Sequence, residues 1–238
     1  MKHGFLKGRT TLTQLIQTYH GILESIATGQ EVDVIYLDLA KAFDKVSNAD
    51  LSHKLAHFGI TGILNKWFQS YLSNRFQRVV LEGTYSDWLE VSSGVPQGSV
   101  LGPILFLLYI NDMPSYLLQN SSLMLFADDS KLYRVINNNS DIISLQEDLT
   151  NLHRWSIDSS MTFSTTKCKV LNISRKINSP IRPYVLDGNP LEVVTDTMDR
   201  GIQFTNNLSW SKHIEWMTIL KVIGHWDWCA ECAGIMSV

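Results

Sequence analysis

The apolar residues of this chain recur with two spacings, one typical of helices and one typical of strands. Over residues 12–26 they fall every third or fourth position, which predicts an amphipathic helix that stops near Gly29. Over residues 32–40 they occupy both faces of an expected strand. Asp38 lies at the end of this buried strand, which is an unusual position for a lone carboxylate.

The same reasoning predicts further helices and hairpins along the chain. Ser47 or Asn48 can cap the expected helix over 51–58, Thr61 the one over 64–72 and Ser140 the one over 140–155. The expected helices cover residues 51–58, 64–72, 99–110 and 140–155. The expected strands form hairpins at 77–91, at 123–136 and around 187–189, with a further strand at 168–173. Because strands and helices are mixed without a regular βαβ order, the predicted fold class is α+β, an antiparallel sheet backed by helices.

Charge and hydropathy narrow the range of functions only slightly. The net charge of -3 at pH 7 argues weakly against nucleic-acid binding. The charge is uneven, however, since no acid precedes Glu24 and a basic cluster covers residues 167–176. The longest apolar run, residues 100–110, is shorter than the roughly 20 residues that a bilayer requires, so it predicts a buried helix and no membrane partner.

The N-terminus and the cysteines bear on the compartment. Residues 1–9 lack the apolar stretch of a secretory signal, and 3 cysteines are too few and too unevenly spaced for a disulfide framework. We therefore expect an intracellular protein, in the nucleus or the cytoplasm. Cys229 and Cys232 have metal-ligand spacing with His225 nearby, but without a second pair incidental cysteines are the better interpretation.

Three aspartates carry the candidate chemistry. Asp38 ends one expected strand, while Asp128 and Asp129 occupy the expected tight turn between two others. Clustered carboxylates suit a pair of Mg²⁺ ions, which can catalyse nucleotidyl transfer. Taken alone, the paired acids are more simply turn residues, and Asp38 is more simply a helix N-cap.

Three segments change this balance. They read YLDLAKAFDKV at residues 36–46, SGVPQGSVLGP at 93–103 and FADD at 126–129. In order and spacing they resemble motifs A, B and C of reverse transcriptases. The sequence is most similar to the non-LTR retrotransposon branch, jockey-like or LINE-like, with further likeness at residues 4–9, 109–112 and 208–213.

The resemblance implies a right-hand polymerase palm with partial fingers and a truncated thumb. The implied division is partial fingers at residues 1–30, the palm with motifs A to D at 31–175, a region like motif E at 176–215 and an unmatched tail at 216–238.

The resemblance also implies roles for individual residues. Asp38, Asp128 and Asp129 would bind two Mg²⁺ ions, for which Mn²⁺ is a substitute, and the Leu39 carbonyl would be a further ligand. Phe43 would be the steric gate beneath the incoming sugar. Its simpler interpretation is a core aromatic residue.

Five other positions have implied contacts with substrate. Gln97 and Gly98 would face the incoming nucleotide and the template, although an ordinary Gly/Pro turn also explains them. Lys167 resembles the motif D lysine that protonates the departing pyrophosphate, and a solvated surface charge is an equal alternative. Lys7 and Arg9 would contact template or primer phosphates, or belong to a mobile N-terminus.

Three departures from the family pattern bear on activity. The match begins at the second half of the fingers, so the basic residues that grip the triphosphate are not expected here. Ser164 stands where the family usually has Asn, and Arg200 stands where it usually has Leu. A buried Arg is costly unless it forms a pair, for example with Asp196 or Asp199.

The implied function is that of an RNA-directed DNA polymerase. Its partners would be an RNA template, a DNA primer and a dNTP, whereas the sequence does not predict the oligomeric state. The alternative is a catalytically dead relic or a co-opted nucleic-acid-binding module. A two-metal nuclease fits less well, because Phe43 and Gln97 have no evident role in it.

Overall fold

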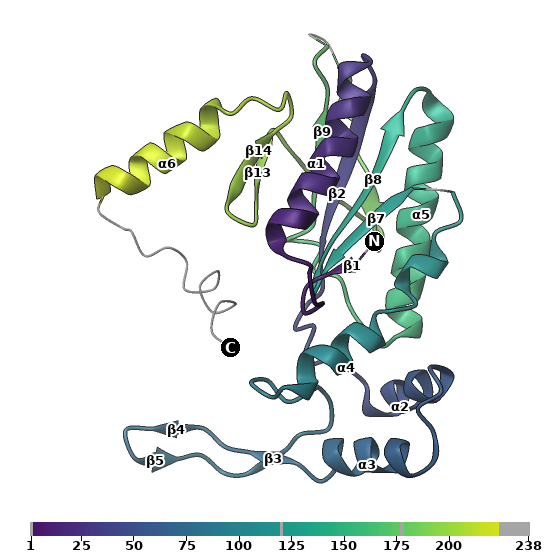
Figure 1. The fold of residues 1–238 in the computed structure, drawn as a ribbon, viewed down its shortest axis with the longest axis vertical. Coiled ribbons are helices and arrows are strands. Elements are labelled where there is room, and N and C mark those ends of the chain that lie inside the picture. The colour runs from purple at the N-terminus through teal and green to yellow at the C-terminus, as the bar shows by residue number, and fades with distance from the viewer. Residues whose placement is uncertain (1, 120, 177–178, 224–238) are drawn as a thin grey trace.

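The centre of the molecule is a twisted sheet of strands that come from distant parts of the chain (Figure 1). The computed structural model describes residues 2–119, 121–176 and 179–223. The 6-stranded sheet has the order β1 (Lys2–His3), β7 (Ser122–Phe126), β8 (Asp129–Ile136), β2 (Glu31–Asp38), β9 (Lys169–Ile173) and β12 (Glu192–Val194). The pairs β1 with β7 and β9 with β12 are parallel, and the others are antiparallel.

Strand β2 is the central strand, and its alternation sends side chains to two different cores. Val32 and Val34 pack in one apolar cluster with Ile22 and Ile26 of α1 (Thr11–Ala27). Side chains on the other face, such as Ile35, belong to a larger cluster that includes the apolar face of α5 (Asn139–Asp158). The predicted strand and its alternation are confirmed, and the strand ends at Asp38.

The α+β prediction is confirmed, because a mainly antiparallel sheet lies between helices on both faces (Figure 1). The predicted cap of α5 is wrong by two residues. The Asn138 side chain accepts hydrogen bonds from the backbone of Ser140 and Asp141, and Asp141 accepts in return from the backbone of Asn138. This reciprocal capping box fixes the helix start before Ser140.

Below the sheet, as drawn in Figure 1, lie α2 (Asn48–His57), α3 (Gly62–Leu72) and α4 (Leu101–Tyr109). The short 3₁₀ helix η1 (Met113–Tyr116) follows α4 and contacts α5. Lys54 joins three of these elements. Its Nζ atom donates to the Tyr109 carbonyl at 2.8 Å, to Asp112 at 2.9 Å and to Ser159 at 2.9 Å. The Trp155 indole donates to the same Asp112 carboxylate at 3.0 Å. This network holds α2 and α4 against α5.

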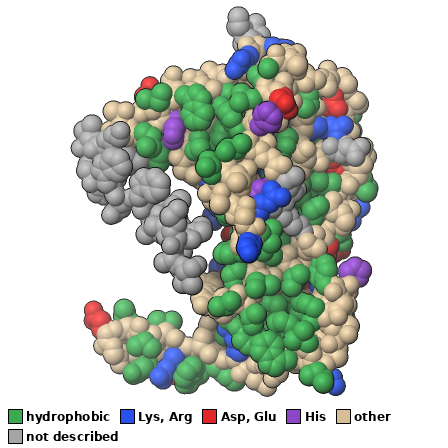
Figure 2. Space-filling model, viewed as in Figure 1, with side chains coloured by type: hydrophobic (Ala, Val, Ile, Leu, Met, Phe, Trp, Pro, Cys, Tyr) green, Lys and Arg blue, Asp and Glu red, His purple; other side chains and the backbone are tan. Residues whose placement is uncertain are grey.

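The prediction that α4 is a buried helix is only partly right, and α3 also leaves apolar side chains exposed. Figure 2 shows apolar side chains gathered over this part of the molecule. Leu64 and Trp67 of α3 are exposed, and so are Val100 and Ile104 at the start of α4. The opposite side of α4, including Leu105 and Phe106, is buried in the larger core.

The hairpin predicted at residues 77–91 is confirmed, and it extends away from the rest of the molecule (Figure 1). Strand β3 (Phe76–Gln77) pairs with β6 (Leu89–Glu90), and β4 (Val80–Leu81) pairs with β5 (Thr84–Tyr85). Its strand residues are exposed throughout. The Arg78 guanidinium lies over the rings of Tyr85 and Trp88, at 4.1 and 4.6 Å from their centres.

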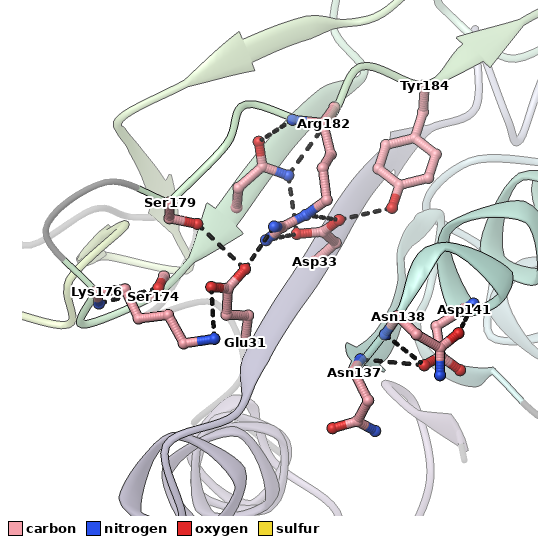
Figure 3. A network of polar contacts seen from close by, with 11 residues as sticks. Glu31, Asp33, Asn137, Asn138, Asp141, Ser174, Lys176, Ser179, Arg182 and Tyr184 are labelled. Atoms are coloured by element: carbon pink, nitrogen blue, oxygen red, sulfur yellow. Dashed lines mark hydrogen bonds and ion pairs between the residues drawn. The ribbon is translucent and has the colours of Figure 1, made fainter.

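A buried ionic network holds the segment after β9 against the start of β2 (Figure 3). The Arg182 guanidinium donates two hydrogen bonds to Asp33, at 2.8 and 2.9 Å, and also pairs with Glu31. The Tyr184 hydroxyl donates to Asp33 at 2.6 Å. Asp33 and Arg182 are both buried, so each depends on the other for compensation of its charge.

The chain continues through two small hairpins to a final described helix. The predicted turn at 187–189 joins β10 (Val185–Leu186) to β11 (Asn189–Pro190), and β13 (Asp196–Asp199) pairs with β14 (Ile202–Thr205). Helix α6 (Ser211–Ile223) extends beyond residue 216, where the sequence predicted no element. Cys229, Cys232 and His225 lie outside the described residues. Among the helices described, none is both long and apolar enough to traverse a bilayer.

Candidate active site

The structure brings the three predicted aspartates together at one end of the sheet. Asp38, the last residue of β2, lies directly opposite Asp129, the first residue of β8. The turn before β8 consists of Ala127 and Asp128, so only one of the two acids lies in the turn, and the prediction is wrong for Asp129. Ala127 has a φ of 51°, a left-handed conformation that costs a residue with a Cβ atom about 1 kcal/mol or more.

The cluster of carboxylates is electrostatically unfavourable for Asp128. Burial raises the pKa of its carboxyl group, and the neighbouring charges of Asp129 and Asp38 raise it further. Its own backbone amide and the cation of Arg200 act in the opposite direction. A further cation at this point would relieve the repulsion, which is the condition expected of a metal-binding site.

Two side chains already supply positive charge to the aspartates. The Lys167 ammonium lies 3.5 Å from an oxygen of Asp38, and the Arg200 guanidinium forms an ion pair with Asp129. Asp38, Asp129, Lys167 and Arg200 all line one cavity of about 430 Å³. Lys131, Lys169 and Asp199 line it as well.

The donor set fits a divalent metal ion of the Mg²⁺ type. Carboxylate oxygens are the ligands that Mg²⁺ prefers, and Asp129 is half exposed at 52% of its side-chain surface. In the described part of the chain, no group of three or more His, Cys, Asp or Glu residues is already arranged around one point as a metal site. Asp38 and Asp129 instead face Lys167 and Arg200, so a metal ion at these carboxylates would compete with both cations for their negative charge.

The segment that carries Lys167 is attached directly to the end of β2. The Ala40 amide donates to the Thr162 carbonyl at 2.8 Å, and the Ser164 amide donates to the Asp38 carbonyl at 2.8 Å. Both hydrogen bonds are made by residues that flank the bridge between Leu39 and Phe163. The Leu39 side chain is buried, while its carbonyl takes part in neither bond.

Phe43 lies in the loop after β2 and is half buried. Its ring stacks on Phe106 of α4, with 4.5 Å between the ring centres, and meets the edge of Phe5 at 6.5 Å. These contacts support the interpretation of Phe43 as a core aromatic residue. They also hold its ring in place, five residues after Asp38. Within the described part of the chain, Phe43 is not among the residues that line the cavity.

The loop that carries Gln97 and Gly98 packs on the loop after Asp38. The Gln97 amide donates to Asp44 at 2.8 Å, and the Ser93 hydroxyl donates to the Asp44 carbonyl at 2.8 Å. Gly94 is required here, since a Cβ atom would lie only 2.8 Å from that carbonyl oxygen and its φ is 92°. Gln97 and Gly98 are both exposed at the tip of this loop.

Lys7 and Arg9 lie on an exposed loop that begins at the aspartate turn. Strand β1 pairs with β7, and a Cβ atom at Gly4 would come within 2.8 Å of the Ala127 nitrogen. The loop is thus anchored beside the turn. Within the described residues, however, the cavity lining includes neither basic side chain.

Two features of the site were not predicted from the sequence. Lys131 and Asp199 form an ion pair with exposed side-chain fractions of only 3% and 6%. Arg200 pairs with Asp129, which corrects the expectation that Asp196 or Asp199 would be its partner. Asp196 pairs instead with Lys212. Lys131 lies two residues after Asp129 in an expected strand, so both side chains point to the same face of the sheet. This spacing was the sequence signal that could have placed Lys131 at the site.

Comparison with known proteins agrees with this geometry. Residues 2–225 match the family described as reverse transcriptase (RNA-dependent DNA polymerase). The chain is 28% identical over 221 residues to the probable RNA-directed DNA polymerase from transposon X-element of Drosophila melanogaster. It is 27% identical over 222 residues to the RNA-directed DNA polymerase from mobile element jockey of the same species. Each alignment covers 89% of this chain and 24% of the relative, so the chain spans about a quarter of their length.

Solved structures support the predicted fold at lower identity. The telomerase of Candida tropicalis, in complex with a fragment of telomeric RNA, has a TM-score of 0.56 and 13% identity, covering 83% of this chain and 32% of that one. The apo form has a TM-score of 0.57 and 14% identity, covering 84% and 36%. This likeness shows a right-hand polymerase fold. The family match over residues 2–225 shows that the chain belongs to the reverse transcriptase family, and the relatives named above are polymerases of mobile elements.

Proposed function

We propose that this chain is a polymerase core that copies an RNA template into DNA by joining dNTPs to a primer 3′-hydroxyl. The observation that carries the proposal is the position of Asp38 directly opposite Asp129, with Asp128 in the adjoining turn and an open cavity beside them. The chain spans about a quarter of its relatives, so the substrates are proposed for the chain as part of such a polymerase. The proposed place of action is intracellular, in the nucleus or the cytoplasm.

The aspartates would hold two divalent ions, Mg²⁺ or in its place Mn²⁺, with the Leu39 carbonyl as a further ligand. When bound, such ions activate the attacking hydroxyl and stabilise the charge of the leaving oxygen. The protein's own contribution is to hold these oxygens at one edge of a rigid sheet. Because Asp38 and Asp129 are a directly opposed pair in the ladder, their backbones are fixed relative to each other.

Other residues around the site would bind or exclude parts of the substrate. Lys167 lies beside Asp38 on a flexible, exposed stem and would donate a proton to the departing pyrophosphate. Phe43 is held by stacking on Phe106, which would give a steric gate its rigidity. Gln97 and Gly98 would contact the nucleotide and template from the exposed loop tip.

The basic loop at the N-terminal end would contact phosphates of template or primer. Lys7 and Arg9 are exposed, and their loop is anchored at the aspartate turn through Gly4. Contacts from such side chains position a nucleic acid without reading its sequence. The position of the loop supports a role next to the primer end.

Primer extension on an RNA template tests the proposal. In the presence of Mg²⁺, Asp128→Ala should lower incorporation below about 1% of the parent rate, the loss expected when stabilisation of transition-state charge is removed. Asp87→Ala is the matched control, because Asp87 is an exposed acid on the distant hairpin. Equal incorporation by the parent chain and Asp128→Ala would exclude the assignment.

A second candidate function is nucleic-acid binding without synthesis, as in a relic or co-opted module. The specific observation in its favour is that Arg200 and Lys167 already occupy two of the three carboxylates. A purified chain that binds primer-template but incorporates no nucleotide, even with Mn²⁺, would establish this alternative.

A further inference from the structure

Arg200 reaches back from a hairpin turn to the candidate metal site. It occupies the turn between β13 and β14 with a φ of 50°, followed by Gly201 with a φ of 83°. Its guanidinium pairs with the Asp129 carboxylate and donates to the Phe126 carbonyl at 3.1 Å. The same group lies over the Phe126 ring, 3.8 Å from the ring centre. With 18% of the side chain exposed, Arg200 is held on three sides.

A second ion pair lies next to the first. Lys131 and Asp199 are almost completely buried and join the same hairpin to the same strand, β8. Asp129 and Lys131 project from one face of β8, and Asp199 and Arg200 are consecutive in the hairpin. The β13–β14 hairpin is therefore attached to the aspartate cluster by two adjacent ion pairs, of which only the one at Asp129 involves a candidate metal ligand.

The carboxylate of Asp129 cannot serve both cations fully. An oxygen that accepts a charge-assisted hydrogen bond from a guanidinium has that lone pair occupied. A divalent ion placed on the same carboxylate would also lie close to the positive charge of Arg200, and like charges at such separation repel strongly in a partly buried site. Metal coordination at Asp129 and the contact with Arg200 therefore oppose each other.

We propose that Arg200 is a built-in competitor for the metal site, so that binding of a divalent cation at Asp129 and release of the Arg200 turn of the β13–β14 hairpin from Asp129 are one coupled event. The inference rests on the proposed function, which makes Asp129 a metal ligand. Coupling of this kind is reciprocal: whatever moves Arg200 away tightens metal binding, and metal binding loosens the hairpin. The Lys131–Asp199 pair keeps the hairpin attached, so it pivots and does not leave.

Mn²⁺ titration of the purified 238-residue chain, followed by the electron paramagnetic resonance signal of the free ion, measures this coupling without any catalytic readout. Arg200→Gln keeps a long polar side chain and removes the charge, while Arg200→Asn tolerates the left-handed backbone. Both variants should bind Mn²⁺ with a Kd about 5- to 20-fold lower than the parent. Arg200→Lys keeps a charge without the planar fork and should fall between them and the parent.

Lys212→Ala is the matched control. It removes an ion pair to Asp196 in the same hairpin but touches no candidate metal ligand. Its Mn²⁺ affinity should equal that of the parent chain. A rise equal to that of Arg200→Gln would show that loosening the hairpin by any route is sufficient, which overturns competition at Asp129.

Hydrogen–deuterium exchange supplies the second readout. In the parent chain, Mg²⁺ should speed exchange over residues 196–205, whereas in Arg200→Asn exchange should be fast already and unresponsive to Mg²⁺. Equal Mn²⁺ affinity in the parent, Arg200→Gln and Arg200→Asn overturns the inference and leaves the proposed function intact. Failure of all these chains to bind Mn²⁺ removes the metal site itself, and the proposed function with it.

Discussion

Asp128 is the residue at which the cost of gathering three carboxylates is concentrated. Burial, followed by the charges of Asp129 and Asp38, raises its pKa in the folded protein above the ordinary value. A carboxyl group whose pKa is raised on folding favours the folded state only while it is protonated. That contribution is complete below the unfolded-state pKa and is lost as the pH rises through the folded-state pKa.

Asp128→Asn should therefore increase the free energy of unfolding at pH 7, where the parent chain carries the unfavourable charge. The gain should vanish at about pH 3, below the ordinary pKa of Asp, because the carboxyl group is then neutral in both states. Urea unfolding at the two pH values measures it, with Asp87→Asn on the exposed hairpin as the control. A variant less stable than the parent at pH 7 would show that Asp128 serves structure more than function.

At the scale of single residues, the sequence predicts local chemistry and misses distant partners. Asp38 at the end of a strand follows from the alternation around it, since a period of two is visible within nine residues. The pairing of Arg200 with Asp129 bridges 71 positions and depends on how a two-residue turn is aimed. No local sequence pattern predicts the direction in which this turn points the Arg200 side chain. For the same reason, the pairing of Lys54 with Asp112 and that of Arg182 with Asp33 were not predicted from the sequence.

At the scale of elements, the sequence predicts most helices and strands, but it predicts their first and last residues less accurately. The cap of α5 moved from Ser140 to Asn138 because two side chains there satisfy the free backbone amides reciprocally. The exposed face of α4 was not predicted, because an apolar sequence indicates burial whether or not another surface covers the helix.

The β3–β6 hairpin is the element that contributes least to the rest of the fold. Its strand residues are exposed, and an isolated two-stranded hairpin adds little stability of its own. Replacement of residues 77–89 by a Gly-Ser-Gly turn should change the free energy of unfolding by less than about 1 kcal/mol. The ends can be joined, because the Val91 amide donates to the Arg75 carbonyl at 2.8 Å.

Urea unfolding followed by the far-ultraviolet circular dichroism signal would measure this effect. A matched change in the core, Leu149→Ala in α5, should cost about 2–5 kcal/mol by comparison, since Leu149 is fully buried. Loss of cooperative unfolding on removal of the hairpin would mean that it supports the packing of α3 and α4.

At the scale of the whole molecule, the net charge of -3 means that binding of nucleic acid depends on local clusters of basic side chains. Affinity for primer-template should then fall on the order of 10- to 100-fold between 50 and 200 mM salt, the range expected for about two to four phosphate contacts. Lys7→Ala with Arg9→Ala should reduce the slope of log affinity against log salt by about 1.5.

Fluorescence anisotropy with a labelled primer-template measures that slope. The matched control is Lys66→Ala with Arg154→Ala, two exposed cations on α3 and α5 whose removal changes the net charge equally. An equal loss of slope in both double variants would assign the effect to total charge and not to the loop beside the aspartates.

The order of strands in the central sheet has a consequence for how the protein is made. Strand β2 is translated before both of its neighbours, which come from residues 129–136 and 169–173. During synthesis this apolar segment stays unpaired until residues 39–136 have been translated, and such long-range pairing is slow and prone to association with other chains. Asp38, at the end of this strand, therefore acquires Asp129 as its neighbour only after residues 39–128 have been translated.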